Sequence, residues 1–298
     1  GKIFAIPTYF FILAMVTTVG IGLFRFFSGS LGTVINPPES SIEGALGVVT
    51  PFLLLHAFAS GTSALTGIEA ISNGITAFRQ PSSKNAGITL VWMSAILGTL
   101  FLSISFLSGK ISAVPSEVET VISQLTRTVF NGQGFFYLAM IAGTAVILII
   151  AANTAFADFP RLGALQANDG FLPRQLTFRG SRLVYSWGIV VLAILASLLI
   201  ILFKASVNAL IPLYAIGVFL SFTLSQTGMA RRWWKSGHLK GDEELVEAGS
   251  TIHVDKRWKF KMLVNSFGAV TTFIVMIVFG VTKFKDGAWV IVFLIPIL

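Results

Sequence analysis

Glu69 is the residue in this sequence best suited to ion chemistry, because it is an acidic residue inside a long apolar segment. The segment runs over about 48–78, and the basic residue Arg79 follows Glu69 by ten positions. At about 1.5 Å per helical residue this spacing corresponds to about 15 Å, half of a hydrocarbon core about 30 Å thick. An ionisable side chain at that depth is costly unless it is paired, hydrated or protonated. We therefore expect an ion or proton site at Glu69.

The residues around Glu69 form a polar stripe in a segment that is too long for one straight helix. As an ideal helix, 48–78 would measure about 46 Å, so we expect a break between about Ser60 and Gly67, where small residues cluster. Such a break frees backbone carbonyls that can coordinate ions. The alternative is a helix-packing seam in which Glu69 is hydrogen-bonded to a neighbour. The stripe has helical spacing and consists of Thr62, Thr66, Glu69 and Asn73.

Two other apolar segments carry polar residues that could contribute to a site. Asn153 and Thr154 lie deep enough to line a cavity, and we predict a second ion site or a gate there, together with Asp158. Asp158 could equally form a helix-end ion pair with Arg161. Tyr214 is either a site residue or an interfacial anchor, since tyrosine favours the membrane boundary.

Other chemistries lack the residues they need. There are no cysteines, and the three histidines have no partner at metal-ligand spacing, so we expect no zinc site. The phosphate-loop pattern G-x-x-x-x-G-K-[ST] does not occur, and no nucleophile is grouped with a base. We expect neither enzymatic activity nor a resident cofactor.

The composition indicates a membrane protein. Of 298 residues, 54% are hydrophobic and only 11% are charged, whereas soluble domains have about 25% charged residues. This excludes a soluble enzyme, a nucleic-acid-binding domain and a disordered chain. Continuous apolar runs of about 20 residues indicate helices, because barrel strands are about half that length. We predict one all-α transmembrane domain over 1–298, with helices over about 4–24, 48–78 (broken), 86–108, 134–159, 184–203, 209–230, 261–282 and 288–298.

The distribution of Lys and Arg predicts how the helices are oriented. Fifteen of the 21 lie in loops on one side, which we assign to the cytoplasm together with the N-terminus. Lys283 and Lys285 are the local exception to this bias. The last apolar run is too short to cross, and the first residue is not Met, so we expect a fragment of a longer protein.

Two loops are expected to have structure of their own. In 116–130 an apolar stripe predicts a short amphipathic helix on the outer surface, with Ser116 and Glu119 as a capping box and Gly132 as its stop. The stripe consists of Val118, Val121, Ile122, Leu125 and Val129. In 231–260, Trp and Arg anchors bracket a polar turn.

Two segments resemble the amino acid–polyamine–organocation permeases, and most of all their KimA-type potassium:proton symporters. Residues 57–74, which read AFASGTSALTGIEAISNG, are similar to the sixth membrane helix of that family. Residues 152–174, which include ADFPR and NDGFLPR, are similar to the eighth helix and the loop after it. The resemblance implies a LeuT-like inverted-repeat fold, of which this chain would be a truncated part. It would contain helices five to twelve, meaning the second five-helix repeat with flanking helices.

The resemblance also implies roles for individual residues. Potassium ligands of the family fall on Thr66 and Glu69, a tyrosine of the tenth helix falls on Tyr214, and carbonyls of Ala64, Leu65 and Thr66 complete the unwound stretch. Asn153 and Thr154 match a position that holds sodium in some relatives. We therefore expect a multi-pass secondary active transporter of the cell membrane that moves potassium with protons.

Two other functions remain open at this point: an amino-acid or polyamine permease on the same fold, and a structural membrane subunit. The threonine hydroxyls, free carbonyls and carboxylate form an all-oxygen set, which hard cations prefer. An amino-acid site would instead need an apolar pocket and N–H groups for a carboxylate. The expected partners are the lipid bilayer and the transported cation, not nucleic acid, and the sequence leaves a homodimer open.

Overall fold

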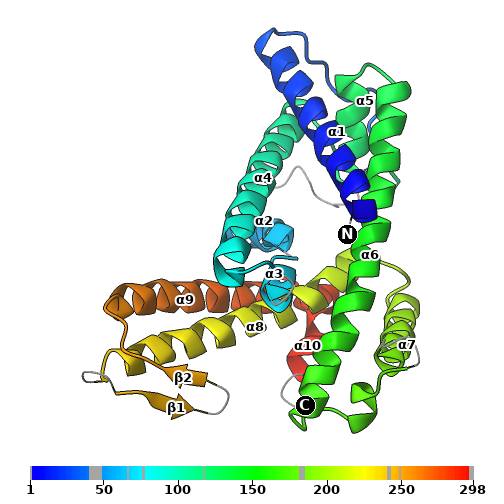
Figure 1. The fold of residues 1–298 in the computed structure, drawn as a ribbon. Helices are drawn as coiled ribbons and strands as arrows, with labels where there is room; N and C mark the ends of the chain where they lie inside the picture. The colour runs from blue at the N-terminus through cyan, green and yellow to red at the C-terminus, as the bar shows by residue number, and fades with distance from the viewer. Residues whose placement is uncertain are drawn as a thin grey trace. The chain divides into compact units, whose positions relative to one another are not determined.

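The computed structural model of the protein consists of helices apart from one small hairpin (Figure 1), and describes residues 2–39, 49–65, 67–75, 78–116, 118–180, 185–239, 243–247 and 250–294. Among these residues, 6 helices are long and apolar enough to cross a membrane, and Ser186–Leu202 is a shorter apolar helix. The prediction of an all-α membrane protein is thereby confirmed. The chain forms two compact units, one of residues 1–48 and 67–195 and one of residues 49–66 and 196–298.

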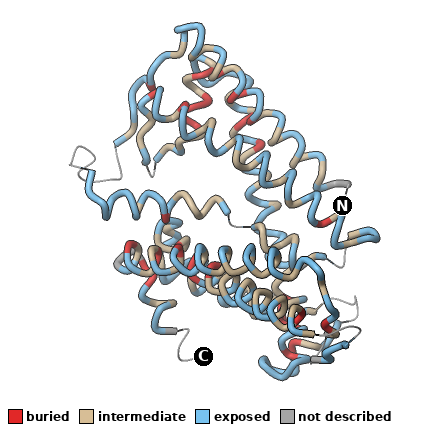
Figure 2. Tube along the Cα trace, turned by 90° about the vertical axis from the view of Figure 1, so that its left-hand side faces the viewer, coloured by how far each residue is buried: buried red, intermediate tan, exposed pale blue. Residues whose placement is uncertain are grey.

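Most residues of the spanning helices are exposed or intermediate in burial (Figure 2), and many of the exposed ones are apolar. Leu102, for example, is 70% exposed and Phe267 is 74% exposed. A water-soluble protein rarely presents such a surface, whereas lipid tails solvate it. The exterior therefore agrees with the composition of the sequence.

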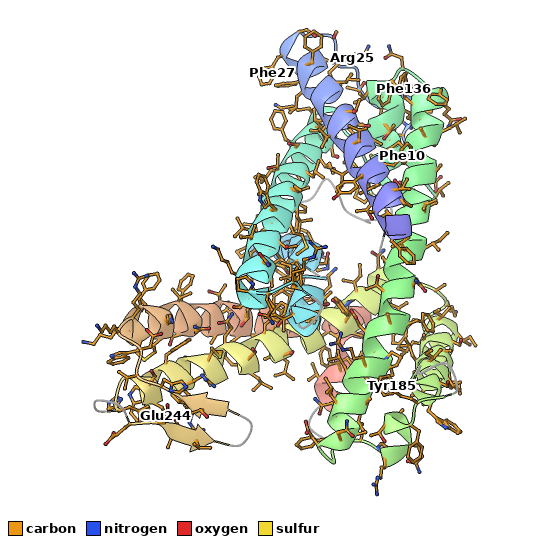
Figure 3. The ribbon with its side chains drawn as sticks, viewed as in Figure 1. Phe10, Arg25, Phe27, Phe136, Tyr185 and Glu244 are labelled. Carbon is orange, nitrogen blue, oxygen red and sulfur yellow. The ribbon has the colours of Figure 1, made fainter. Side chains whose placement is uncertain are left out.

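The first unit is built around α1, which packs against α4, α5 and α6. Its elements are α1 (Lys2–Phe27), α3 (Glu69–Asn73), α4 (Ser82–Lys110), α5 (Val121–Val129), α6 (Phe135–Asn168), η3 (Arg174–Thr177) and the first part of α7 (Ser186–Leu202). Arg25, near the end of α1 in Figure 3, donates to the carbonyl of Val129 and to Asn131 Oδ1. These bonds join the end of α1 to the end of α5.

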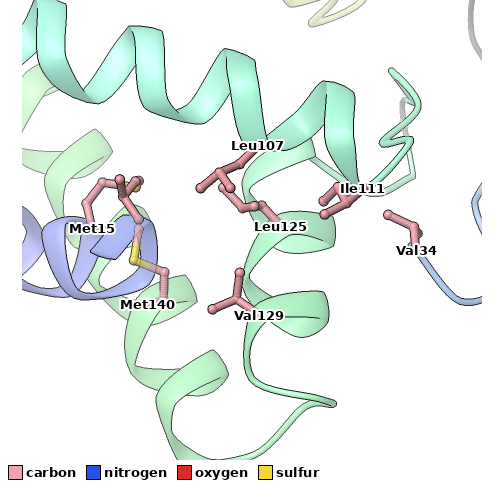
Figure 4. Packing of buried hydrophobic residues seen from close by; sticks show 8 residues of the cluster. Met15, Val34, Leu107, Ile111, Leu125, Val129 and Met140 are labelled. Atoms are coloured by element: carbon pink, nitrogen blue, oxygen red, sulfur yellow. The ribbon is translucent and has the colours of Figure 1, made fainter. Parts of the chain in front are cut away.

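The buried core of this unit lies where α1, α4, α5 and α6 meet (Figure 4). Leu107 of α4 is fully buried, and a Cβ atom built on Gly22 of α1 would lie 2.8 Å from Leu107 Cδ1. Gly22 therefore lets the leucine approach the α1 backbone closely. The buried members are Met15, Val19, Val34, Leu107, Ile111, Leu125, Val129 and Met140.

The helix expected in 116–130 is present, but its start and its buried face differ from the prediction. The cap is Thr120, whose hydroxyl accepts from the Ser123 N–H at 3.2 Å, and not Ser116. Val118 is 90% exposed, while the buried face includes Gln124, whose amide bonds both backbone groups of Val114. Because both ends of its amide are hydrogen-bonded, Gln124 can be buried although it is polar, and a search for apolar residues at helical spacing does not find it.

Glu119 is an ion-pair partner and not a capping residue. Arg127 donates to both of its carboxylate oxygens, at 2.8 and 3.1 Å, and Ser123 donates to it at 2.7 Å. Burial raises the pKa of Glu119, but the bonds from Arg127 and Ser123 and the charge of Arg127 outweigh it, so the pKa lies below the usual value of 4.5. Arg127 also donates to the Ile35 carbonyl, which ties α5 to the loop after α1.

Because folding lowers this pKa, the pair contributes stability that is fully present above about pH 4.5 and is lost as the pH falls through the folded-state value. We expect acidification from about pH 5 to about pH 3 to lower the melting temperature of the purified protein more than that of Glu119→Gln. Thermal unfolding in detergent across this range measures the difference. Parallel curves for the two proteins would contradict a stabilising role for the pair.

Helix α6 continues past the expected end at 159 and contains Pro160. A proline removes one helical hydrogen bond and bends a helix, so an apolar run that meets one is easily taken to stop there. Here Pro160 is buried, and α7 approaches it at Gly188. A Cβ atom built on Gly188 would lie 2.7 Å from Pro160 Cβ and 2.8 Å from Pro160 Cα.

We expect Gly188→Ala to destabilise the protein, because the added methyl group would meet backbone that cannot move aside without separating α6 from α7. Overpacking of this kind costs about 1–3 kcal/mol. Gly98→Ala in α4 is the matched control, since a Cβ atom there meets no described atom within 4 Å. Thermal stability in detergent should fall for Gly188→Ala and stay unchanged or rise for Gly98→Ala. Equal melting temperatures would refute the close contact.

The second unit is centred on α8 and α9, which pack side by side (Figure 1). Its elements are α2 (Pro51–Thr62), η1 (Ser63–Leu65), α8 (Val207–Ser236), β1 (Leu245–Glu247), β2 (Ser250–Ile252), α9 (Trp258–Thr282), the π-turn η4 (Phe284–Ala288) and α10 (Trp289–Leu294). Its buried core comprises Ala59, Ala215, Ile216, Phe219, Val275, Phe279 and Ala288. The charged stretch after 230, expected to be loop, continues α8 to Ser236.

A polar clasp closes the hairpin onto the end of α8. The buried Ser236 hydroxyl donates to the His253 carbonyl at 2.6 Å and accepts from the Asp255 N–H at 3.1 Å. Arg232 donates to the Thr251 carbonyl at 3.1 Å. Strands β1 and β2 pair antiparallel, with Val246 opposite Thr251.

Candidate ion site at the helix break

Helix α2 has a defined start and ends where the sequence predicts the break. Thr50 caps it by accepting from the Leu53 N–H at 3.1 Å, and Pro51 occupies the first helical position, where the missing N–H is not needed. The α-helix ends at Thr62, and Ser63–Leu65 forms a tighter 3-10 turn. Thr66, expected to bind potassium, lies outside the described residues.

Three hydroxyl groups line this end of α2. Ser60, Thr62 and Ser63 donate to carbonyls three or four residues earlier, at 3.0, 2.8 and 2.6 Å. Each hydroxyl gives its one hydrogen to the helix, so both lone pairs of its oxygen remain able to accept. The end of α2 is therefore rich in oxygen atoms that can coordinate a cation or water.

Glu69 begins the short helix α3 and lies close to a glycine with a positive φ angle. Gly67 has a φ of +95°, a conformation that side chains with a Cβ rarely adopt, and its N–H donates to Glu69 Oε2 at 2.9 Å. Glu69 is half-buried, and α3 packs against α4 and α6 in the first unit. The Glu69 carboxylate thus accepts a backbone hydrogen bond just before α3. Its negative charge also interacts favourably with the dipole at the N-terminus of the helix.

The other expected residues lie on two long helices. Asn153 and Thr154 are exposed on α6, Asp158 is half-buried there, and the Thr154 hydroxyl donates to the Ile150 carbonyl at 3.1 Å. Tyr214 is 42% exposed on α8, on the face opposite its buried residues. Glu69 and the three α6 residues belong to the first unit, whereas Thr62, Ala64, Leu65 and Tyr214 belong to the second.

A cavity of about 60 Å³ lies beside the end of α2, and the sequence did not point to it. Ser60, Ser63, Asn208 and Lys283 supply its polar lining, and it has room for a few water molecules, each of which needs about 10–15 Å³. In the sequence, the indication for Lys283 is that it departs from the bias of Lys and Arg toward one side of the membrane. Asn208 had no signal beyond being polar at the start of an apolar helix.

A larger cavity, of about 690 Å³, lies in the first unit beside the Glu119–Arg127 pair. Its two charged residues already neutralise each other, at 2.8 Å between Arg127 Nε and Glu119 Oε1. The smaller cavity lies beside the hydroxyl groups at the break, but Lys283 in its lining carries a positive charge that opposes a bound cation.

Comparison with known proteins places these features in a family. Residues 1–298 match the family described as amino acid permease. The chain is also 40% identical over 297 residues to the potassium transporter KimA of Bacillus subtilis (strain 168). That match covers 100% of this chain and 46% of the relative, so the chain spans about half the length of the curated relative it matches.

Proposed function

Because the chain belongs to the amino acid permease family, we propose that it is part of a secondary active transporter that takes up potassium together with protons. The observation that carries this proposal is the interrupted α2–α3 segment, with Glu69 at the start of its second half. Transporters of many folds use such breaks to offer backbone and side-chain oxygens to ions. The 40% identity to a protein named a potassium transporter supports potassium as the cargo.

The oxygen atoms around the break have the chemistry that potassium requires. Hydroxyls of Thr62 and Ser63, carbonyls of Ala64 and Leu65, and the Glu69 carboxylate are all hard ligands. From its position in the sequence, Thr66 would supply one more hydroxyl ligand. Tyr214 of α8 would supply a phenol oxygen. The carboxylate also balances the charge of a bound cation, which neutral oxygens cannot do.

The group that couples potassium transport to protons would be either the Glu69 carboxylate or the polar residues of α6. A carboxyl group that binds a proton when the cation leaves would couple the two movements. Asp158 would act as a gate, and Asn153 with Thr154 would form a second ion position. We place the transporter in the cytoplasmic membrane with the N-terminus of this chain inside, since most Lys and Arg residues lie in loops on that side.

An amino-acid or polyamine permease is the second candidate, because the matching family is described by amino acid transport. Uptake of rubidium-86 by the full-length protein in liposomes separates the two. We expect electrogenic uptake that is driven by an inward proton gradient, is inhibited by potassium and is unaffected by amino acids or polyamines. Uptake of a labelled amino acid or polyamine, with no rubidium uptake, would favour the second candidate and refute potassium transport.

A further inference from the structure

The basic residues of 231–261 gather at the two ends of this stretch, while most acidic residues lie between them in the sequence. This stretch has eight Lys and Arg and five Asp and Glu. The bases lie in 231–235 and 256–261, apart from Lys240, and four of the five acids lie in 242–247. Charge is therefore segregated along this part of the chain.

The two helix ends meet, so their bases share one region of the surface. The Trp258 ring of α9 lies against Gly237 at the end of α8, so closely that a Cβ atom at Gly237 would be 2.2 Å from it. The Lys261 ammonium lies 4.3 Å from the centre of the Trp233 ring. These contacts hold the start of α9 against the last turns of α8.

Part of the charge in this region serves the fold. Lys261 pairs with Asp255, Arg232 holds the Thr251 carbonyl, and Glu244 lies 3.0 Å from His253 on the hairpin (Figure 3). The hydrogen bonds from the Lys261 side chain and from the Arg257 N–H lower the pKa of Asp255. The Asp255 carboxylate therefore interacts with these two neighbouring groups. These groups explain the closure of the loop but not the remaining bases.

Four of the remaining bases face solvent, namely Arg231 of α8 and Lys256, Arg257 and Lys259 at the start of α9, whereas Lys235 is half-buried. They lie where the apolar parts of both helices end, which is the depth of lipid headgroups. Trp234, 52% exposed, lies in the same turn of α8, and tryptophan prefers that depth. Clusters of Lys and Arg directly beside spanning helices attract anionic lipids.

We propose that the exposed bases Arg231, Lys256, Arg257 and Lys259 form a binding surface for the phosphate headgroups of anionic phospholipids. The ligand is a lipid and not a free phosphate, because the bases lie beside the membrane-spanning parts of α8 and α9 and next to an exposed interfacial tryptophan. The inference needs only a membrane-embedded chain, so it stands independently of which solute is transported.

The test uses the full-length protein, purified from an equimolar mixture of phosphatidylglycerol and phosphatidylcholine, with the retained lipids counted by native mass spectrometry. We expect wild type to retain phosphatidylglycerol in preference, by about tenfold or more, given the attraction of each basic residue. The triple variant Lys256→Gln, Arg257→Gln, Lys259→Gln should lose this preference. Raising the salt concentration should also weaken it.

A matched triple variant, Lys84→Gln, Arg174→Gln, Lys204→Gln, removes three exposed bases elsewhere and should keep the preference. Unchanged melting temperatures would establish that both variants fold. Equal lipid ratios in the two triple variants, or no preference in wild type, would overturn the proposal. Displacement of the lipid by millimolar glycerol phosphate would identify the surface as a free-phosphate site and overturn it as well.

Discussion

Glu69→Gln in the full-length protein is expected to reduce potassium-dependent uptake by about a hundredfold or more. A carboxylate about 4 Å from a cation contributes about 4 kcal/mol where the effective dielectric constant is about 20, and the amide offers only a dipole in its place. The substitution also keeps the shape of the side chain, so the acceptor for the Gly67 N–H is retained. Rubidium-86 uptake against external potassium, at two pH values, measures the effect.

Asp158→Asn is the control for this measurement, and its effect should be weaker. Asp158 lies in α6 close to Arg161 and to the expected cytoplasmic face, where water and neighbouring charge screen it. If Glu69 carries the proton and not the cation, Glu69→Gln will retain potassium binding but lose the response to pH. Wild-type kinetics in Glu69→Gln at both pH values would exclude both roles and leave the packing-seam interpretation.

Leu107→Ala is expected to cause the largest loss of stability among single substitutions in the first unit. Its side chain is fully buried between α1, α4 and α5, so its removal leaves a cavity. Buried leucine-to-alanine changes cost about 2–5 kcal/mol. We expect about 2–3 kcal/mol here, because lipid already solvates apolar groups and mainly the packing contribution is lost. Thermal unfolding in detergent, followed by size-exclusion chromatography, reports this loss.

Leu102→Ala is the matched control on the same helix, since its side chain is 70% exposed. Alanine is a good helix former, and nothing in the core depends on this side chain, so its melting temperature should match wild type. If the two variants lost stability equally, the core at Leu107 would not be specifically packed.

The family and the class of fold could be read from the sequence, because both depend on strong local signals. Apolar runs of membrane-spanning length predict helices whatever their partners are. The match over residues 1–298 confirms the resemblance to the permeases first indicated by residues 57–74 and 152–174. The small residues between Ser60 and Gly67 likewise lie where α2 ends.

Features that depend on tertiary contacts could not be read in the same way. The end of α6 was placed too early, because hydropathy falls at Asp158 and Pro160, whereas the helix is continued by its packing on α7 and η3. The sequence pattern places the cap of α5 at Ser116, whereas the helix begins at Val121 and Thr120 caps it. The cavity beside Ser60 joins residues more than 140 positions apart, such as Asn208, and no spacing rule connects them.

The clasp at Ser236 fixes where the chain after β2 meets the end of α8. One buried hydroxyl bonds both the His253 carbonyl and the Asp255 N–H, so residues 253–255 must arrive at a set position after α8. Extra residues after Val254 would separate the two residues that Ser236 bonds together, whereas extra residues after Leu239 lie outside 253–255 and leave this spacing intact. The loop between α8 and α9 thus has a site for a fluorescent reporter or an affinity tag at 239, and its base should be left unaltered.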